Sequence, residues 1–151
     1  MFRGDLDLHA TIRAPITAVF DALTDHEGMA AWPGVASALL VREGSPRNGP
    51  GAVRRIRAGG LTIDEELVAW SPPHRFEYRI VKGLPVRHRG EVELTERTED
   101  GGPVTTVTWR IRMSSPIPLF APIVGWRVKD GLREALAFVT RRLEASYTAL
   151  P

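Results

Sequence analysis

Apolar and polar residues alternate along the first part of the chain. Every second residue between positions 5 and 13 is apolar, a period of two that predicts a strand with one buried face. Pro15 suits the first turn of a helix, where its missing N–H breaks no hydrogen bond. Val19 and Leu23 lie one helical turn apart and give that helix an apolar stripe. The pattern predicts a strand, a short helix and, after a cap at Asp25, a second short helix.

Short segments with the same alternation fill the middle of the chain. Strands are expected over residues 35–43, 53–58, 61–70, 76–80, 90–94 and 107–113, and residues 98–103 are expected to form a hairpin loop. The sharpest local signal is Gly59-Gly60, a dipeptide typical of a tight two-residue turn. This turn sets the register of its hairpin, because it places Arg54 opposite Glu65 and Ile56 opposite Ile63.

Arg54 and Glu65 share the apolar face of that predicted hairpin. A single charge buried in apolar surroundings is strongly destabilising, whereas a buried ion pair is tolerated. We therefore expect Arg54 and Glu65 to form a buried salt bridge. On the opposite face Arg55 meets Asp64 in an exposed cross-strand pair, which contributes little to stability.

The end of the chain changes from strand spacing to helix spacing. From Pro122 onward apolar residues recur at intervals of three and four, which predicts one long amphipathic helix. Its stripe comprises Val128, Leu132, Leu136, Val139, Leu143 and Tyr147. Together these elements predict one α+β domain over residues 1–151, in which a curved sheet grips the terminal helix and leaves a cavity against it.

The composition is that of a soluble globular domain, with 43% hydrophobic and 25% charged residues among 151. No apolar run approaches the roughly 20 residues that a membrane span requires. No apolar segment follows a positively charged start, so we expect a cytoplasmic protein without a signal peptide. The absence of cysteine excludes disulfides and thiolate chemistry, and four scattered histidines predict neither a metal site nor a cofactor.

The net charge of +2 is small, and basic residues are interleaved with acidic ones. Arg54-Arg55-Ile56-Arg57 is the densest basic cluster, but strand alternation divides it between two faces. A nucleic-acid interface typically gathers its basic residues on one face beside aromatic side chains. We therefore expect no nucleic-acid partner.

Several short motifs occur in an order that resembles a known family. They are Ala14-Pro15, Val19-Phe20-Asp21-Ala22-Leu23-Thr24-Asp25, Trp32-Pro33-Gly34-Val35, Gly49-Pro50-Gly51, Glu65, Pro72-Pro73, Phe76-Glu77-Tyr78 and Val107-Thr108-Trp109. Over nearly the whole chain they resemble the polyketide cyclase/dehydrase-like branch of the START (SRPBCC, Bet v 1-like) superfamily. The resemblance implies a helix-grip fold: a seven-stranded curved antiparallel sheet around a long C-terminal helix, with two short helices after the first strand.

The resemblance also implies a pocket for a small hydrophobic or amphipathic molecule, such as a polyketide, a lipid or a quinone, between the sheet and the C-terminal helix. Fold analogy does not choose among the activities of such relatives. One alternative is a true aromatase/cyclase or dehydratase, a lyase or isomerase acting on a poly-keto substrate. Another is a protein-interaction domain, chaperone-associated or toxin-like. The pattern selects no oligomeric state and leaves a homodimer possible.

Cyclisation and dehydration of a keto chain need a group that polarises a carbonyl and an acid or base near the reacting carbon. Arg54 is the candidate for the first role, Tyr78 for proton donation, and Glu65 or His88 for proton removal. The residues expected to contact a ligand are Trp32, Ile56, Ile63, Tyr78, His88, Trp109, Trp126 and Leu132. For the same residues a structural role is the competing interpretation, Arg54–Glu65 as a stabilising ion pair and the aromatic residues as core.

One connecting segment is unusually apolar. Residues 113–122 join the last strand to the long helix and combine three prolines with Ile117, Leu119 and Phe120. A loop of this composition either packs down as a plug or serves as a lid over a pocket. We expect residues 84–86 to form the opposing lip.

Overall fold

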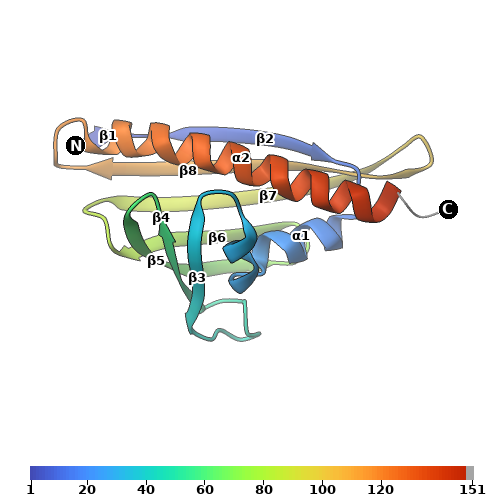
Figure 1. Ribbon diagram of the computed structural model, residues 1–151, viewed down its shortest axis with the longest axis horizontal. Helices are drawn as coiled ribbons and strands as arrows, with labels where there is room; N and C mark the ends of the chain where they lie inside the picture. The colour runs from blue at the N-terminus through green and yellow to red at the C-terminus, as the bar shows by residue number, and fades with distance from the viewer. Residues whose placement is uncertain (149–151) are drawn as a thin grey trace.

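The computed structural model describes residues 1–148 and arranges them as one curved antiparallel sheet with helices packed against it (Figure 1). In chain order the elements are β1 (Phe2–Arg3), β2 (Leu6–Ile12), α1 (Ile16–Thr24), the 3₁₀ helix η1 (Glu27–Ala31), β3 (Val35–Arg42), β4 (Val53–Ala58), β5 (Leu61–Ser71), β6 (Arg75–Lys82), β7 (Arg87–Glu99), β8 (Gly102–Ser115) and α2 (Phe120–Thr148). Apart from the short β1, which the sequence pattern did not predict, the order is the one expected from the sequence. Asp25 acts as a cap, because its Oδ1 accepts a hydrogen bond from the Gly28 N–H at 3.1 Å.

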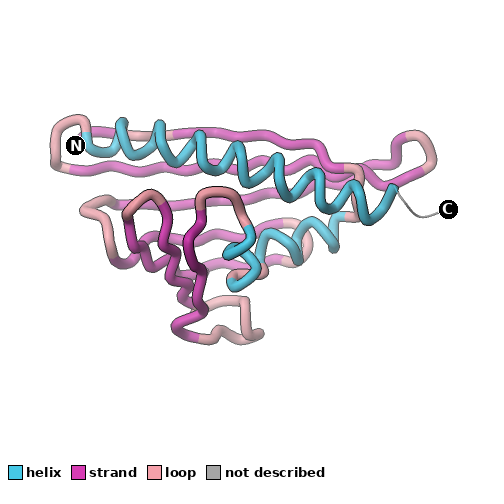
Figure 2. The backbone as a smooth tube through the Cα atoms, in the orientation of Figure 1, coloured by secondary structure: helices cyan, strands magenta, loops and turns pink. Residues whose placement is uncertain are grey.

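The strands follow the order β1-β8-β7-β6-β5-β4-β3, and β2 also pairs with β8. Both β1 and β2 pair with the same edge of β8, one after the other, so the sheet has seven strand positions, as expected. Helix α2 lies along β2 and β8, and α1 lies beside the C-terminal half of α2 (Figure 2). This arrangement confirms the predicted helix-grip fold.

The β4–β5 hairpin has the predicted register. Gly59 and Gly60 take positive φ angles of 57° and 78°, which a glycine adopts without steric cost. Arg54 consequently lies opposite Glu65. A local dipeptide therefore fixes which two charges meet on the concave face of the sheet.

The β7–β8 hairpin differs from the prediction. The expected loop over residues 98–103 is wrong, because β7 continues to Glu99 and β8 begins at Gly102. Asp100 and Gly101 alone form the turn, with φ angles of 52° and 77°. Positive φ at both central residues matches the twist of the flanking strands. The two strands are therefore longer than the sequence pattern indicated.

The core lies between the concave face of the sheet and the helices. Trp109 on β8, Phe76 on β6 and Phe20 on α1 are almost completely buried. Phe20 meets Phe76 edge to face, with ring centroids 5.7 Å apart. Leu136 and Val139 bring the predicted stripe of α2 into the same core.

Helix α2 begins at Phe120, just before the expected start at Pro122. Its first turns approach β1 closely, since a Cβ on Gly125 would lie 2.9 Å from the carbonyl oxygen of Gly4. The predicted stripe is wrong at Tyr147, which lies in the last helical turn and is 41% exposed. Within residues 1–148, no helix has the length and apolar character needed to cross a membrane.

Candidate ligand-binding site

Arg54 and Glu65 form the predicted buried salt bridge. Arg54 Nε donates to Glu65 Oε1 at 2.8 Å, and the two side chains are 4% and 12% exposed. Their Cα atoms are directly paired across β4 and β5, so the register alone brings the two groups together. The expected outer pair is present too, with Arg55 bound to both carboxylate oxygens of Asp64 at 2.8 and 3.0 Å. The expectation that it is exposed is wrong for Asp64, whose side chain is only 10% exposed.

His26 extends this salt bridge into a buried chain of polar groups. It lies between α1 and η1 and is 1% exposed. Its Nδ1 lies 3.1 Å from Arg54 Nη1 and its Nε2 lies 2.8 Å from the carbonyl oxygen of Asn48. A guanidinium can only donate, so Nδ1 accepts and Nε2 carries the hydrogen. Burial and the Arg54 charge lower the pKa of His26 to about 4, and the imidazole is neutral at physiological pH.

No sequence pattern marks His26 as a residue of the site. The residue belongs to no alternating pattern, and its contacts join a helix–helix link to a distant strand. The only local signal is its place directly after the capping Asp25, which says nothing about Arg54. Such a contact depends on tertiary packing and has no local sequence signature.

Tyr78 is the second polar centre of the site. Its hydroxyl oxygen accepts a hydrogen bond from Trp109 Nε1 at 2.9 Å. The Arg54 guanidinium carbon lies 4.8 Å from the centroid of its ring, within the range of a cation–π contact. Burial, followed by the nearby Glu65 charge, raises the pKa of Tyr78 well above its usual value. The phenol is therefore a hydrogen-bond donor and a very weak acid.

His88 lies beside Tyr78 on the concave face, and the strand alternation alone leaves it either inward or at the rim. The two ring centroids are 5.3 Å apart. His88 Nδ1 accepts a hydrogen bond from the Ile80 backbone N–H at 3.2 Å, so the hydrogen of the neutral ring lies on Nε2. Burial lowers the pKa of His88, and the charges of Glu65 and Arg54 act on it as well.

Gly90 makes room for this aromatic cluster. It is paired with Tyr78 across β6 and β7, and a Cβ at this position would lie 2.3 Å from the Tyr78 ring. The ring thus lies over the glycine and reaches Trp109, which belongs to β8, the strand beyond β7. Any side chain at residue 90 would displace it.

The structure brings together five of the predicted site residues: Arg54, Glu65, Tyr78, His88 and Trp109. Among the remaining predicted contacts, Trp32 is buried, Ile56, Ile63 and Leu132 are half-buried, and Trp126 is exposed. The half-buried aliphatic residues come from β4, β5 and α2. Trp126 stands apart from the cluster, with 67% of its surface exposed.

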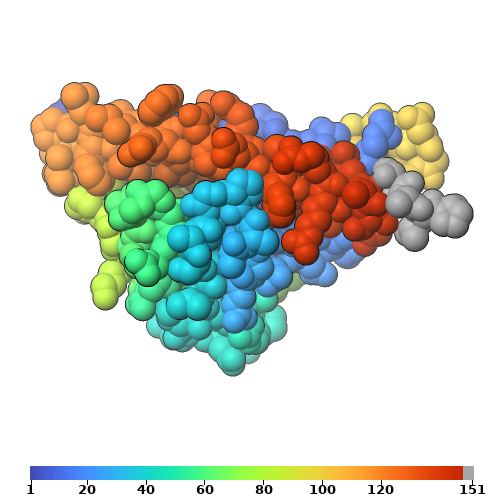
Figure 3. Space-filling model, in the orientation of Figure 1, coloured from blue at the N-terminus to red at the C-terminus, as the bar shows by residue number. Residues whose placement is uncertain are grey.

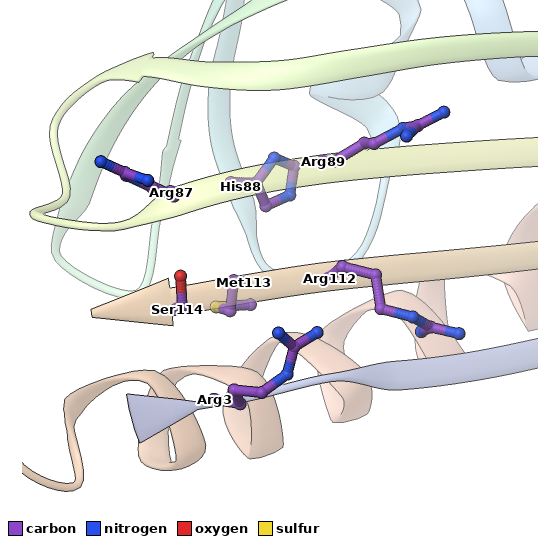
Figure 4. Close-up of a pocket in the computed structure, with 7 residues that line it drawn as sticks. All are labelled: Arg3, Arg87, His88, Arg89, Arg112, Met113 and Ser114. Carbon is purple, nitrogen blue, oxygen red and sulfur yellow. The ribbon is translucent and has the colours of Figure 1, made fainter. Parts of the chain in front are cut away.

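Two recesses open at one end of the sheet. A recess of about 200 Å³ is lined by His88, Met113, Ser114 and four arginines (Figure 4). A larger one, of about 430 Å³, lies between residues 84–87 and the start of the β8–α2 connection at Ser114 and Pro116. His88 therefore links the buried polar cluster to an opening at the surface.

The predicted opposition of two apolar loops is confirmed at this end. Ser115 Oγ donates to the carbonyl oxygen of Pro85 at 2.9 Å and accepts from the Ile117 N–H at 3.2 Å. One hydroxyl therefore ties the lip over residues 84–86 to the β8–α2 connection.

Several polar atoms of the cluster have hydrogen-bonding capacity to spare. Within residues 1–148, Arg54 Nη2 and Glu65 Oε2 have no protein partner, and the Tyr78 hydroxyl hydrogen has no acceptor. Across the same residues, no group of three or more histidine and carboxylate side chains could hold a metal ion. The spare capacity is mostly that of donors, which suits an acceptor oxygen on a ligand.

Known proteins share this fold. A family model described as "Polyketide cyclase / dehydrase and lipid transport" matches residues 3–144. The solved structure of the protein XoxI from Bacillus cereus has a TM-score of 0.73 at 18% identity, covering 95% of this chain and 96% of that one. A START superfamily protein from Mycobacterium smegmatis has a TM-score of 0.69 at 10% identity, covering 92% and 98%. At these identities the two structures establish the fold alone. No curated protein matches the sequence.

Proposed function

The chain belongs to the polyketide cyclase/dehydrase and lipid-transport family, whose START-like fold is a ligand-binding domain. From this premise we propose that it binds a small hydrophobic or amphipathic molecule between the sheet and α2. The ligand carries a carbonyl or similar acceptor oxygen, which the buried donors of Arg54 and Tyr78 recognise. Polyketides, quinones and lipid esters all have this chemistry.

The observation that carries the proposal is the pair of unused donors in an apolar surrounding. Arg54 is 3% exposed and Tyr78 is also 3% exposed, yet each keeps donor capacity that no described residue uses. A ligand oxygen that accepts from both would use this capacity. Among the described residues, Asn48 Oδ1 is the one buried side-chain nitrogen or oxygen that has no hydrogen-bond partner. Half-buried Ile56 and Leu132 supply apolar surface for the rest of the molecule.

Binding explains the site better than acid–base catalysis. The raised pKa of Tyr78 makes it a poor proton donor, and Nδ1 is occupied in both His26 and His88. A catalytic base needs a free lone pair within reach of the proton that it removes. Both histidines present the wrong atom for that role, since the remaining ring nitrogen carries hydrogen.

The alternative of a cyclase or dehydratase rests on one specific observation. Glu65 Oε2 has no protein partner among the described residues, while Oε1 is bound to Arg54. A carboxylate held in this way could remove a proton from a carbon next to a carbonyl that Arg54 polarises. The protein-interaction alternative has no comparable observation and stays a prediction.

The test is native mass spectrometry of freshly purified protein, followed by solvent extraction and identification of any bound molecule. Displacement of the dye 1-anilinonaphthalene-8-sulfonate by quinones, fatty acids and aromatic polyketones then ranks the ligand classes. Tyr78→Phe should weaken the best ligand by about tenfold, the value of one lost buried hydrogen bond. Arg55→Gln, on the outer face, is the matched control and should leave affinity unchanged.

Three outcomes separate the alternatives. Weaker binding in Tyr78→Phe with unchanged binding in Arg55→Gln supports the proposed site. Equal affinity in both variants, with both still folded, contradicts it. Conversion of a poly-keto probe by wild-type protein, lost in Glu65→Gln while binding persists, favours the enzyme.

A further inference from the structure

Three segments that are distant in sequence meet at one end of the sheet. We call residues 1–4, 82–90 and 113–129 together the basic end. Arg3 and Arg87 both pair with Ser114, one from each side of β8. Gly4 packs against Gly125 at the start of α2. In Figure 1 this region is the end of the sheet that carries β1 and the first turn of α2.

The basic end has a charge that the rest of the molecule does not share. It contains six cationic residues, Arg3, Lys82, Arg87, Arg89, Arg127 and Lys129, and no aspartate or glutamate. Its formal charge is therefore +6. The whole protein has 20 basic and 18 acidic residues, so the remainder has 14 and 18 and a charge of −4. A small net charge thus conceals a strongly polarised molecule.

Most of these cations are not neutralised within the protein. Arg3 pairs with Asp5, and Arg89 pairs with Glu77. Within residues 1–148, the other four, Lys82, Arg87, Arg127 and Lys129, form no salt bridge. The guanidinium groups also do not converge, since Arg87 and Arg89 extend in opposite directions from β7 (Figure 4). The arrangement is a diffuse positive surface and not a pocket for one anion.

The same end gathers exposed apolar side chains. Twelve large hydrophobic residues of the described chain are exposed, and six of them lie here: Met1, Phe2, Ile117, Leu119, Ile123 and Trp126. Figure 3 shows the β8–α2 connection and the first turns of α2 forming the outer surface of this end. Ile123 and Trp126 lie three residues apart in the first turns of α2, and Leu119 directly precedes the helix, where its carbonyl oxygen accepts a hydrogen bond from the Ile123 N–H at 3.1 Å. We call these three residues the stripe. The stripe faces solvent, so the structure leaves it without a partner.

Leu119 is exposed and also strained. Its φ angle of 62° lies in the left-handed region, which leucine rarely adopts, and 62% of its surface is exposed. Asparagine or glycine would be more stable at such a position. A strained, protruding leucine is typical of a functional contact and not of a residue that stabilises the fold.

We propose that the basic end docks on an anionic lipid surface. The cations meet the phosphate groups, and the stripe formed by Leu119, Ile123 and Trp126 enters the boundary between headgroups and acyl chains. Apolar residues flanked by lysine and arginine, with a tryptophan at the edge, form an interfacial membrane contact. The proposal does not depend on the ligand in the pocket.

The positive charge of the basic end argues against a second copy of this chain as its partner. Two copies of this chain meeting through the basic end would bring four unpaired cations against four, and the like charges would oppose the apolar contact. An anionic bilayer satisfies the charges and the stripe together. The larger recess opens at this same end, between residues 84–87 and Pro116, so docking would face its opening toward the lipid.

Co-sedimentation of the purified full chain with vesicles tests the proposal. Vesicles of phosphatidylcholine with phosphatidylglycerol should bind at least about tenfold more protein than phosphatidylcholine alone, and added salt should release it. Arg87→Gln should weaken binding about fivefold, the value of one cation near an anionic surface. Arg141→Gln is the matched control, because Arg141 is exposed, forms no salt bridge among the described residues and lies in the C-terminal half of α2, away from the basic end (Figure 1).

A second pair of variants tests the apolar stripe. Leu119→Asn suits the left-handed backbone, so it should fold at least as well as wild type while binding about tenfold less. Leu39→Asn removes a leucine of similar exposure on β3 and should bind normally. Bromine-labelled phospholipid should quench the fluorescence of wild-type protein but not of Trp126→Phe.

The proposal is overturned if both vesicle types bind equally or not at all, or if the controls lose as much binding as the test variants. Sedimentation equilibrium gives an independent contradiction. A dimer in wild-type protein that Leu119→Asn dissolves would assign the stripe to self-association.

Discussion

The indole N–H of Trp109 donates to the phenol oxygen of Tyr78 across an intervening strand. The two residues belong to β8 and β6, and Gly90 of β7 lies between them. This hydrogen bond holds the Tyr78 oxygen in place. Because the oxygen acts as the acceptor, the phenol keeps its own hydrogen, which points away from the indole. The same contact that orders the core thus leaves the phenol hydrogen available as a donor.

This relationship predicts a measurable coupling. Tyr78→Phe should destabilise the protein by about 1–3 kcal/mol, because it leaves the buried Trp109 N–H without an acceptor. In a Trp109→Phe background, Tyr78→Phe should lower the free energy of unfolding much less, because no indole N–H is then left without an acceptor. A double-mutant cycle by urea unfolding should give a coupling energy of about 1 kcal/mol. Additive effects within experimental error would show that the hydrogen bond contributes nothing to stability.

The Arg54–Glu65 pair predicts a recovery on double substitution. Glu65→Ala should lower the free energy of unfolding by about 3 kcal/mol, since it leaves the Arg54 charge buried with only a neutral histidine beside it. Arg54→Met combined with Glu65→Leu should regain most of that loss, because no charge is then buried. Chemical denaturation of both variants checks the prediction. A Glu65→Ala protein as stable as wild type would contradict it.

Local patterns predicted this pair for a definite reason. Gly59-Gly60 makes a two-residue turn, and a turn of this length allows only one register between the two strands that it joins. Where neighbours in sequence determine the geometry, the residues of the site could be identified before the structure.

The remainder of the site depends on contacts between distant elements. The approach of His26 to Arg54 depends on how the α1–η1 link packs against β4. The hydrogen bond between Tyr78 and Trp109 depends on two strands that are not neighbours. The charge of the basic end was hidden because its three segments are far apart in sequence. Each of these features arises from the order of strands in the sheet, which no local spacing encodes.

The contact between Gly90 and Tyr78 predicts opposite outcomes for two similar substitutions. Gly90→Ala places a Cβ 2.3 Å from the Tyr78 ring, so it should destabilise the protein by about 1–3 kcal/mol and weaken ligand binding. Gly102→Ala, at the start of β8, meets no atom within 4 Å and should be neutral or slightly stabilising. Thermal unfolding of both variants compares them directly. Equal melting temperatures would mean that the ring moves aside without cost.

The buried neutral His26 predicts that stability falls on mild acidification. Its pKa is lowered to about 4 in the folded protein, against about 6.5 when unfolded. Between these values the unfolded chain binds more protons than the folded one, so stability is fully present above pH 6.5 and falls as the pH approaches 4. The expected loss is about 3 kcal/mol. His88, whose pKa is also lowered, adds to the same slope.

Urea unfolding at several pH values between 4.5 and 6.5 isolates this effect, because the carboxylates with lowered pKa values, such as Asp64 and Glu66, lose their contribution mainly below that window. His26→Gln should remove most of the slope, since the variant side chain does not titrate. His74→Gln, at an exposed position, should keep the wild-type slope. A His26→Gln protein with an unchanged pH dependence would mean that the imidazole is protonated in the folded state, which its contact with the Arg54 guanidinium opposes.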